Sequence, residues 1–278
     1  TSKDIFGRTV LFYAVDSRCV ELVSLLVSHE DIELNAEDRS GRTPLSYAAQ
    51  YGYSDVVKAL LDGERIDVNQ RDALGLSPLL YASKEGHEAV TRILLERKEI
   101  LVNCLNSQGR SSLSLAAQRG HENVVCLLLD SSDVDVNLTD LVGRTPLSYS
   151  AQYGRGHHDI VRLLLARKDV YFNSKDKQGR TALAHAAHSG HEPVIKQLIS
   201  VPGILLNEPD NSGRLPLHHA ASNGHSGVIR VLFGLEDLDV NHADIWGATP
   251  LMCAAMSGHF EAVCLFLNRR GVDVWALD

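Results

Sequence analysis

The stretch Gly41-Arg-Thr-Pro-Leu-Ser-Tyr-Ala-Ala-Gln-Tyr-Gly52 occurs twice in the chain, because residues 143–154 repeat it with a single change, a serine at position 150. Looser copies begin at six other glycines: Gly7, Gly75, Gly109, Gly179, Gly213 and Gly247. Successive glycines are 34 residues apart, except that Gly143 and Gly179 are separated by 36. A fixed period of this length is typical of proteins built from stacked repeats. We therefore expect a single array of eight repeats over residues 1–278.

Each repeat opens with Asp-x-x-Gly, or once with Asn-x-x-Gly, which is a type I turn signature. The opening residues are Asp4, Asp38, Asp72, Asn106, Asp140, Asp176, Asp210 and Asp244. In many repeats a hydroxyl and a proline follow, as in Thr43-Pro44, and this pair predicts a helix N-cap with Pro at the first helical position. We expect the short helix to end at a glycine such as Gly52. A second helix is predicted where apolar residues recur at helical spacing, as in residues 56–61.

Thr-Pro-Leu, Ala-Ala, Gly-His and Val-Asn recur at fixed offsets, and together they resemble the ankyrin repeat over nearly the whole chain. The resemblance implies an all-α solenoid of stacked helix-turn-helix units with protruding hairpin-like loops. It also implies a concave surface that binds protein partners, as in the recognition segments of larger intracellular signalling proteins. Both end repeats are apolar where natural arrays close with polar residues, so we expect the chain to be part of a longer protein.

Four departures from the pattern are local. The first repeat has Arg18-Cys19 where others have Gly-His, so its first helix is expected to end less cleanly. The seventh repeat has Leu215 in place of the capping hydroxyl, and the fifth carries two extra residues within 154–158. Trp275 stands where an asparagine closes the other repeats. Those asparagines are expected to bond the loop backbone, and they are Asn35, Asn69, Asn103, Asn137, Asn173, Asn207 and Asn241.

The composition excludes several classes of function. The formal net charge is −8, whereas proteins that bind nucleic acid or anionic membranes without specificity need a basic surface. No apolar run approaches the length of a membrane-spanning helix. The five cysteines form no Cys-x-x-Cys motif, which indicates neither a disulfide framework nor a zinc knuckle. We therefore expect an intracellular protein, cytoplasmic or nuclear, whose partner is a protein or peptide.

The histidines are the candidates that this sequence offers for a catalytic or metal-binding site. Phosphate-binding loops and nucleophile elbows do not occur, and the His-Glu pairs at His87, His121 and His191 lack the second histidine of a zinc protease. Nine of the 13 histidines fall between His157 and His242, where stacked repeats could bring rings together around a metal. Histidines filling polar helix positions are the better account. We expect no enzyme and no cofactor; an enzyme or metal site in repeats five to seven and a purely structural spacer are the alternatives.

The variable positions of the repeats supply the candidate binding residues. Between Asp and Gly the chain places apolar residues at loop tips, where they are unusual unless a partner covers them. The candidates at the tips are Phe6, Leu74, Leu141 and Trp246. Tyr51 and Tyr153 occupy equivalent positions at the end of the first helix, and aromatic residues dominate binding hot spots. The tyrosines one turn earlier are interpreted as packing between repeats, and they are Tyr13, Tyr47, Tyr81 and Tyr149.

Arginine follows the turn glycine in six of the eight repeats. The candidates from this row, besides Arg8, are Arg42, Arg110, Arg144, Arg180 and Arg214. One arginine per repeat could meet an acidic segment of an extended partner. The alternative is that each arginine pairs with a nearby aspartate such as Asp38 or Asp140, in contacts that contribute little on an exposed surface. The sequence leaves both interpretations open.

Overall fold

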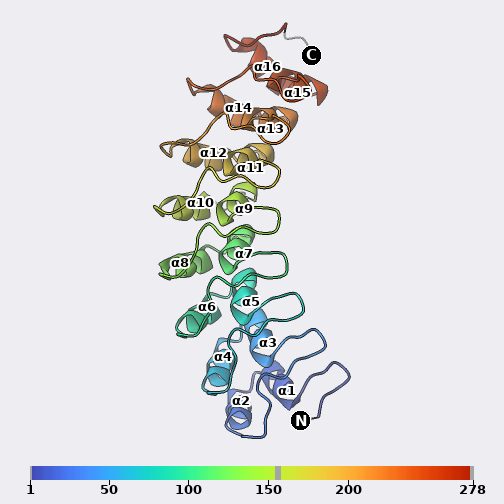
Figure 1. Ribbon diagram of the computed structural model, residues 1–278, viewed down its shortest axis with the longest axis vertical. Helices are drawn as coiled ribbons and strands as arrows, with labels where there is room; N and C mark the ends of the chain where they lie inside the picture. The colour runs from blue at the N-terminus through green and yellow to red at the C-terminus, as the bar shows by residue number, and fades with distance from the viewer. Residues whose placement is uncertain (1, 154–157, 276–278) are drawn as a thin grey trace. The chain divides into compact units, whose positions relative to one another are not determined.

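The computed structural model describes residues 2–153 and 158–275, and in these ranges the regular secondary structure is helical. The one β-bridge found there joins Leu105 to Ser111 and belongs to no strand. The helices occur as successive pairs along the chain, which confirms the predicted all-α class (Figure 1). Contacts divide the chain into two compact units, Thr1–Leu141 and Val142–Asp278.

Unit 1 holds the first four helix pairs. Its helices are α1 (Val10–Asp16), α2 (Val20–Val27), α3 (Pro44–Tyr51), α4 (Ser54–Leu61), α5 (Pro78–Glu85), α6 (Glu88–Leu95), α7 (Ser112–Arg119) and α8 (Glu122–Asp130). The first helices pack in one row, α1 on α3, α3 on α5 and α5 on α7, and the second helices pack in a parallel row. The loops that carry the Asp-x-x-Gly turns project beyond the row of first helices (Figure 1).

Unit 2 repeats this arrangement. Its helices are α9 (Pro146–Gln152), α10 (His158–Leu165), α11 (Ala182–Ser189), α12 (Glu192–Ile199), α13 (Pro216–Ser222), α14 (Ser226–Phe233), α15 (Pro250–Met256) and α16 (Phe260–Asn268). The first helices again form one row, in which α11 packs on α9 and α13, and α13 packs on α15. The predicted two-residue insertion falls between α9 and α10, and all of its stretch except His158 lies outside the described residues.

The turn and cap chemistry predicted from the sequence is present in the second repeat. The backbone N–H groups of Ser40 and Arg42 donate to Asp38 Oδ1 at 2.8 and 3.0 Å, and Gly41 takes the left-handed conformation with φ 77°. Thr43 Oγ1 accepts from the Ser46 N–H at 3.1 Å and caps α3. These bonds satisfy donors that the helix itself leaves unpaired, so the sequence determines where α3 begins.

In each of these repeats a turn joins the first helix to the second. The turns of neighbouring repeats contact each other through a histidine of one and a glycine of the other. His87 Nε2 lies 2.9 Å from the Gln50 carbonyl oxygen, and its ring covers Gly52. A Cβ atom at Gly52 would come within 2.5 Å of that ring, so no other residue fits there. The first repeat solves the same problem differently. Arg18 adopts the left-handed conformation, with φ 55°, and its guanidinium stacks 4.1 Å from the ring centre of Tyr53.

The asparagines at the ends of the repeats bond the loop backbone, as predicted. Asn35 Nδ2 donates to the Arg65 carbonyl at 2.7 Å, and Asn35 Oδ1 accepts from the Asp67 N–H at 2.8 Å. The same pair of bonds reaches the following repeat from Asn69, Asn103, Asn173, Asn207 and Asn241. Each asparagine therefore links one repeat to the next. Trp275, at the equivalent position in the last repeat, is largely exposed.

Candidate partner-binding surface

The predicted apolar residues at the loop tips are exposed. Phe6, Leu74 and Leu141 in unit 1 expose 55%, 61% and 62% of their surface, and Trp246 in unit 2 exposes 61%. Backbone hydrogen bonds join each tip to the next, as where the Ser107 N–H donates to the Leu74 carbonyl at 2.9 Å. The tips of a unit are therefore held in a row while their side chains face solvent, which is the arrangement expected of residues available to a partner.

The tyrosines at the C-terminal ends of two first helices are further exposed aromatic residues. Tyr51 is 47% exposed and Tyr153 is 43% exposed. In unit 1, Tyr51 belongs to a cluster in which its ring centre lies 4.7 Å from that of Tyr47 and 5.8 Å from that of Tyr53. In unit 2, Tyr153 stacks on Tyr149 at 6.5 Å. These ring contacts restrict the side chains before a partner arrives, which lowers the entropy cost of binding.

The row of tyrosines one turn earlier has two structural roles. The Tyr47 hydroxyl donates to Asp16 of the preceding repeat at 3.0 Å, and burial and this bond raise its pKa to about 12. Tyr81 instead donates to Asp72 of its own repeat at 2.6 Å, and burial first and the bond to Asp72 second raise its pKa as well. The predicted role in contacts between repeats is therefore confirmed for Tyr47, whereas Tyr81 stabilises the turn that opens its own repeat.

Several arginines of the row pair with aspartates in the turns. Arg42 Nη2 lies 2.8 Å from Asp38 Oδ2, and the Arg42 guanidinium also donates to Gln50 at 3.1 Å. Arg180 forms the equivalent pair with Asp176 at 3.2 Å. The Arg42 and Arg180 side chains are both less than one quarter exposed. These arginines therefore brace the turns from beneath the loop tips.

Other arginines of the same row find different partners. Arg214 Nε reaches Asp244 of the following repeat at 3.1 Å, and its guanidinium lies over the Trp246 ring at 5.3 Å. Arg110 donates to Gln118 at 2.9 Å. Arg144 lies 3.9 Å from Asp176 and makes the corresponding bond to Gln152 at 2.9 Å. A single sequence position thus serves three kinds of contact, and sequence reasoning did not anticipate this variety.

One histidine in each of repeats six and seven contacts the aspartate that opens its repeat. His185 Nε2 lies 3.0 Å from Asp176 Oδ2, and His219 Nε2 lies 3.0 Å from Asp210 Oδ2. Burial lowers the pKa of His185 in spite of its bond to the carboxylate. Among the described residues, no three or more His, Cys, Asp or Glu side chains are grouped so that they could hold a metal ion. The geometry thus lends no support to the alternative of a metal site there.

Sequence reasoning missed the pairing between the opening residue and the residue nine positions later. Tyr13 bonds Asp4 at 2.7 Å in the same way as Tyr81 bonds Asp72 and as the histidines bond Asp176 and Asp210. A signal for this pairing was present. The one repeat that opens with asparagine, at Asn106, has Leu115 nine residues later, and leucine has no hydrogen to donate.

Comparison with protein families explains this geometry as a whole. A family model for ankyrin repeats, describing three copies, matches residues 1–72, 64–140, 132–210 and 200–278. The comparison with curated proteins returned no match. In the part of the chain that the structure describes, no helix is both long enough and apolar enough to cross a membrane. Because the matched segments together cover the chain from end to end, this protein belongs to the ankyrin repeat family.

Proposed function

We propose that this chain is a protein-interaction module whose loop tips and first-helix ends bind an extended segment or a surface of a partner protein. One observation carries the proposal: large apolar and aromatic side chains are exposed at alternate loop tips of unit 1, at Phe6, Leu74 and Leu141, and at Trp246 in the last repeat of unit 2. Burying such side chains stabilises a complex, because apolar surface leaves water and aromatic anchors dominate binding energy. Ankyrin repeats in general bind proteins, and we assign that role here to the loop tips and the ends of the first helices.

The spacing of the tips in unit 1 describes the partner's anchors. Phe6, Leu74 and Leu141 alternate with the polar tips Ser40 and Gln108. Stacked helices are about 8–10 Å apart, so apolar tips two repeats apart are separated by roughly 20 Å. An extended chain advances about 3.3 Å per residue. A partner segment lying along the tips would therefore place an apolar residue at each tip roughly every six residues.

The arginine row supports an acidic partner less strongly than the tips support an apolar one. Arg42, Arg180 and Arg214 are already paired with aspartates and are partly buried. A carboxylate of the partner would have to displace those contacts or share them. We therefore place the main binding energy at the tips and a smaller, salt-sensitive contribution at the arginines.

We further propose that the module works inside the cell as the recognition segment of a signalling protein. The chain has five cysteines, an odd number without a Cys-x-x-Cys motif, and this pattern is typical of a protein in a reducing compartment. The net charge of −8 opposes non-specific binding to nucleic acid and to anionic membranes. A protein partner is the class that remains.

The test compares two sets of three serine substitutions, each made at large exposed hydrophobic residues. The tip variant replaces Phe6, Leu74 and Leu141, and the control variant replaces the exposed residues Leu101, Tyr171 and Leu205 in the loops that follow second helices. Each variant and the unaltered chain serve as bait in quantitative co-purification from cell extract. We expect a set of proteins that the unaltered and control chains retain equally and the tip variant loses at least tenfold. Equal retention by all three folded baits would show that the tips do not bind a partner.

A further inference from the structure

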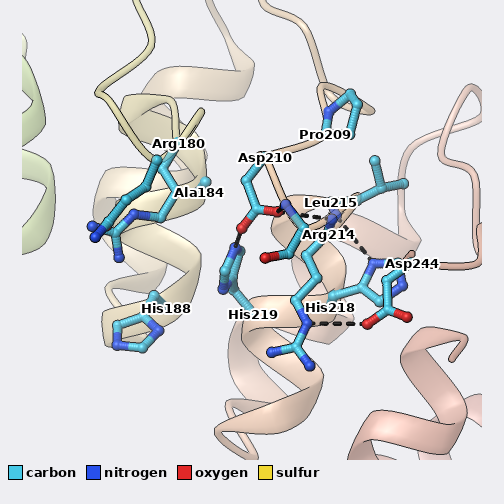
Figure 2. A network of polar contacts seen from close by, with 12 residues as sticks. Arg180, Ala184, His188, Pro209, Asp210, Arg214, Leu215, His218, His219 and Asp244 are labelled. Carbon is cyan, nitrogen blue, oxygen red and sulfur yellow. Dashed lines mark hydrogen bonds and ion pairs between the residues drawn. The ribbon is translucent and has the colours of Figure 1, made fainter. Parts of the chain in front are cut away.

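Helix α13 has no hydroxyl at its N-cap, and its first turn is bonded differently from that of the first helices that have one. In α9 the N-cap Thr145 hydroxyl accepts from the Ser148 backbone N–H at 3.2 Å. At α13 the N-cap is Leu215, which has no side-chain oxygen. His218, three residues later, instead turns its side chain back, and its Nδ1 accepts from the Leu215 backbone N–H at 3.1 Å (Figure 2). A side chain in the helix therefore caps the backbone before it.

The other ring nitrogen of His218 joins the seventh repeat to the eighth. His218 Nε2 lies 3.1 Å from the carbonyl oxygen of Ala248, which precedes α15. A carbonyl only accepts, so Nε2 must carry the hydrogen, and the Leu215 N–H only donates, so Nδ1 must carry the lone pair. One neutral tautomer therefore satisfies both contacts. The imidazole is fully buried, so water cannot replace either contact while the junction is closed.

A proton on His218 Nδ1 would place two N–H groups face to face at a buried site. The Leu215 N–H would lose its acceptor, and the new imidazolium N–H would gain none there. Burying a polar group without a partner, and a charge above all, costs several times the free energy of an ordinary hydrogen bond. The closed junction therefore excludes the protonated ring, whereas an opened junction admits it together with water.

The charges around His218 modify this effect without cancelling it. From the loop before α15, Asp244 favours the cation, but its carboxylate is paired with Arg214 at 3.1 Å (Figure 2). His242, whose ring centre is 6.0 Å away, and His219 oppose the cation. Burial is the largest cause, and the pKa of His218 is lowered to about 4.

The three helices packed against α13 carry few further titratable groups. In α11 these are His185 and His188, and the His188 ring meets that of His219 at 5.8 Å rather than that of His218. In α14 the titratable residue is Arg230, which pairs with exposed Glu261. In α15 it is Cys253, whose pKa is raised by burial. None of these groups holds His218 in its charged form.

We propose that His218 is an acid-sensitive latch that holds the eighth repeat against the seventh when neutral and releases the junction when protonated. The inference goes beyond partner binding, because it concerns how firmly two repeats of the array are joined. The hydroxyl caps elsewhere, such as Thr145, do not titrate. Acid therefore loosens this junction more than it loosens helix starts that are capped by a hydroxyl, and the loop of the eighth repeat that carries Trp246 becomes mobile with it.

The size of the effect follows from linkage. An opened junction binds the proton with the ordinary pKa of about 6.5, whereas the closed junction binds it only near 4. The latch is fully closed above pH 6.5 and weakens as the pH falls from 6.5 towards 4. Between pH 7.5 and pH 5.0 the opening equilibrium should increase about 30-fold, since 1.5 units separate pH 5.0 from the pKa of the open state.

Hydrogen exchange of the whole chain at pH 7.5 and 5.0 tests the proposal, after correction for the intrinsic pH dependence of exchange. Peptides containing Leu215 to His218, and those containing Ala248, should lose protection about 30-fold in acid. The segment from Thr145 to Gln152, which has a hydroxyl cap, is the internal reference and should change less than threefold. Equal changes in the reference and the junction would overturn the proposal.

A double substitution tests whether His218 itself is responsible. Leu215→Thr with His218→Ser transplants the cap that Thr145 and Ser148 form in α9. The variant should be protected at pH 7.5 and should lose the acid response. The matched control, His225→Gln, leaves Leu215 and His218 untouched and should keep the response. An acid response that persists in the double variant would assign the effect to another group.

Nitrogen NMR of the unaltered chain provides a measurement that requires no variant. The His218 ring should show a protonated Nε2 and an unprotonated Nδ1 at pH 7.5, and it should not titrate near 6.5. The opposite tautomer, or titration at the ordinary pKa, would exclude the latch even if the double variant failed to fold.

Discussion

The two units share one backbone plan but differ in the residue that bonds the opening aspartate. In unit 1 that residue is tyrosine in the first and third repeats, through the Tyr13–Asp4 and Tyr81–Asp72 bonds. In unit 2 it is histidine in the two central repeats, through His185 and His219. Phenol and imidazole both place a donor at the same point, but only imidazole titrates near neutral pH. The array can therefore keep its fold while the group that bonds this aspartate differs from repeat to repeat.

The distribution of charge shows the same difference. Unit 1 contains 22 acidic and 14 basic residues, so it accounts for the whole formal charge of −8. Unit 2 contains 13 of each, together with 10 of the 13 histidines. Histidine is the side chain whose ordinary pKa lies nearest neutral pH, so the two units differ in the number of residues of this type. Repeats contact only their neighbours, so such differences can accumulate locally without disturbing the rest of the array.

The largest expected effect comes from removing the aspartate that opens a repeat. Asp176→Ala in unit 2 leaves the Arg180 guanidinium and the buried His185 ring without their carboxylate, so we expect a loss of about 3–5 kcal/mol. Asp72→Ala in unit 1 removes the acceptor of the Tyr81 hydroxyl, a neutral donor, and should cost about 2 kcal/mol. Hydrogen exchange of α11 and α5 measures the two losses separately.

Asparagine substitutions at the same positions are the controls. Asp176→Asn and Asp72→Asn keep the oxygen that accepts the turn N–H groups, as Asn106 does in the fourth repeat. Each should cost less than the alanine substitution. If Asp176→Ala and Asp72→Ala lower the free energy of unfolding equally, the charge of Arg180 does not make Asp176 more important than Asp72.

Acidification from pH 7.5 to 5.0 gives the next largest effect. The pKa of His218 is lowered to about 4 and that of His185 is also lowered by burial, so the unfolded chain binds more protons than the folded one in this range. Stability is therefore lost as the pH falls below 6.5, by about 2 kcal/mol from His218 alone at pH 5.0. The bonded Asp176 has its pKa lowered to about 2, so its contribution is lost only below about pH 4.

Unit 1 should respond to base rather than to acid. The raised pKa of Tyr47, about 12, means that its stabilisation is complete below pH 10 and is lost as the pH rises towards 12. Between pH 7.5 and 5.0 we expect unit 1 to lose less than about 0.5 kcal/mol. Tyr81→His should transfer acid sensitivity to α5, because it places a titratable ring beside Asp72. A Tyr81→His chain whose unit 1 is as indifferent to acid as before would contradict the explanation.

The smallest expected effect concerns the arginine pairs. Arg42→Gln and Arg180→Gln each remove a partly exposed ion pair and should cost about 0–1 kcal/mol at pH 7.5. The two variants should differ in acid. The charge of Arg180 helps to lower the pKa of His185, so its removal should make the acid-induced loss of stability in α11 smaller, whereas Arg42→Gln should not change the acid response of α3. Hydrogen exchange between pH 7.5 and 5.0 measures both responses.

Much of the fold could be predicted from the sequence because the contacts that decide it recur at a fixed offset. The type I turn at Asp38, the cap at Thr43 and the asparagine bridge from Asn35 each involve residues close in the chain or about one repeat away. A period of 34 residues aligns such positions, so eight imperfect copies define one pattern. The exposure of Phe6 and Trp246 followed from the same alignment, since tips of turns face solvent.

The sequence by itself thus determined the helix pairs, their caps and the residues at the loop tips. Only the tertiary structure decided which side chains meet. Arg180 and Arg214 occupy one sequence position, yet Arg180 pairs with Asp176 of its own repeat and Arg214 with Asp244 of the next. The reason is spatial: the eighth repeat supplies Ala248 at this position, so the Asp244 carboxylate is open to an arginine from the seventh. The bond between the Leu215 amide and His218 is also decided by the tertiary structure. Packing places His218 Nδ1 where it accepts from the Leu215 N–H.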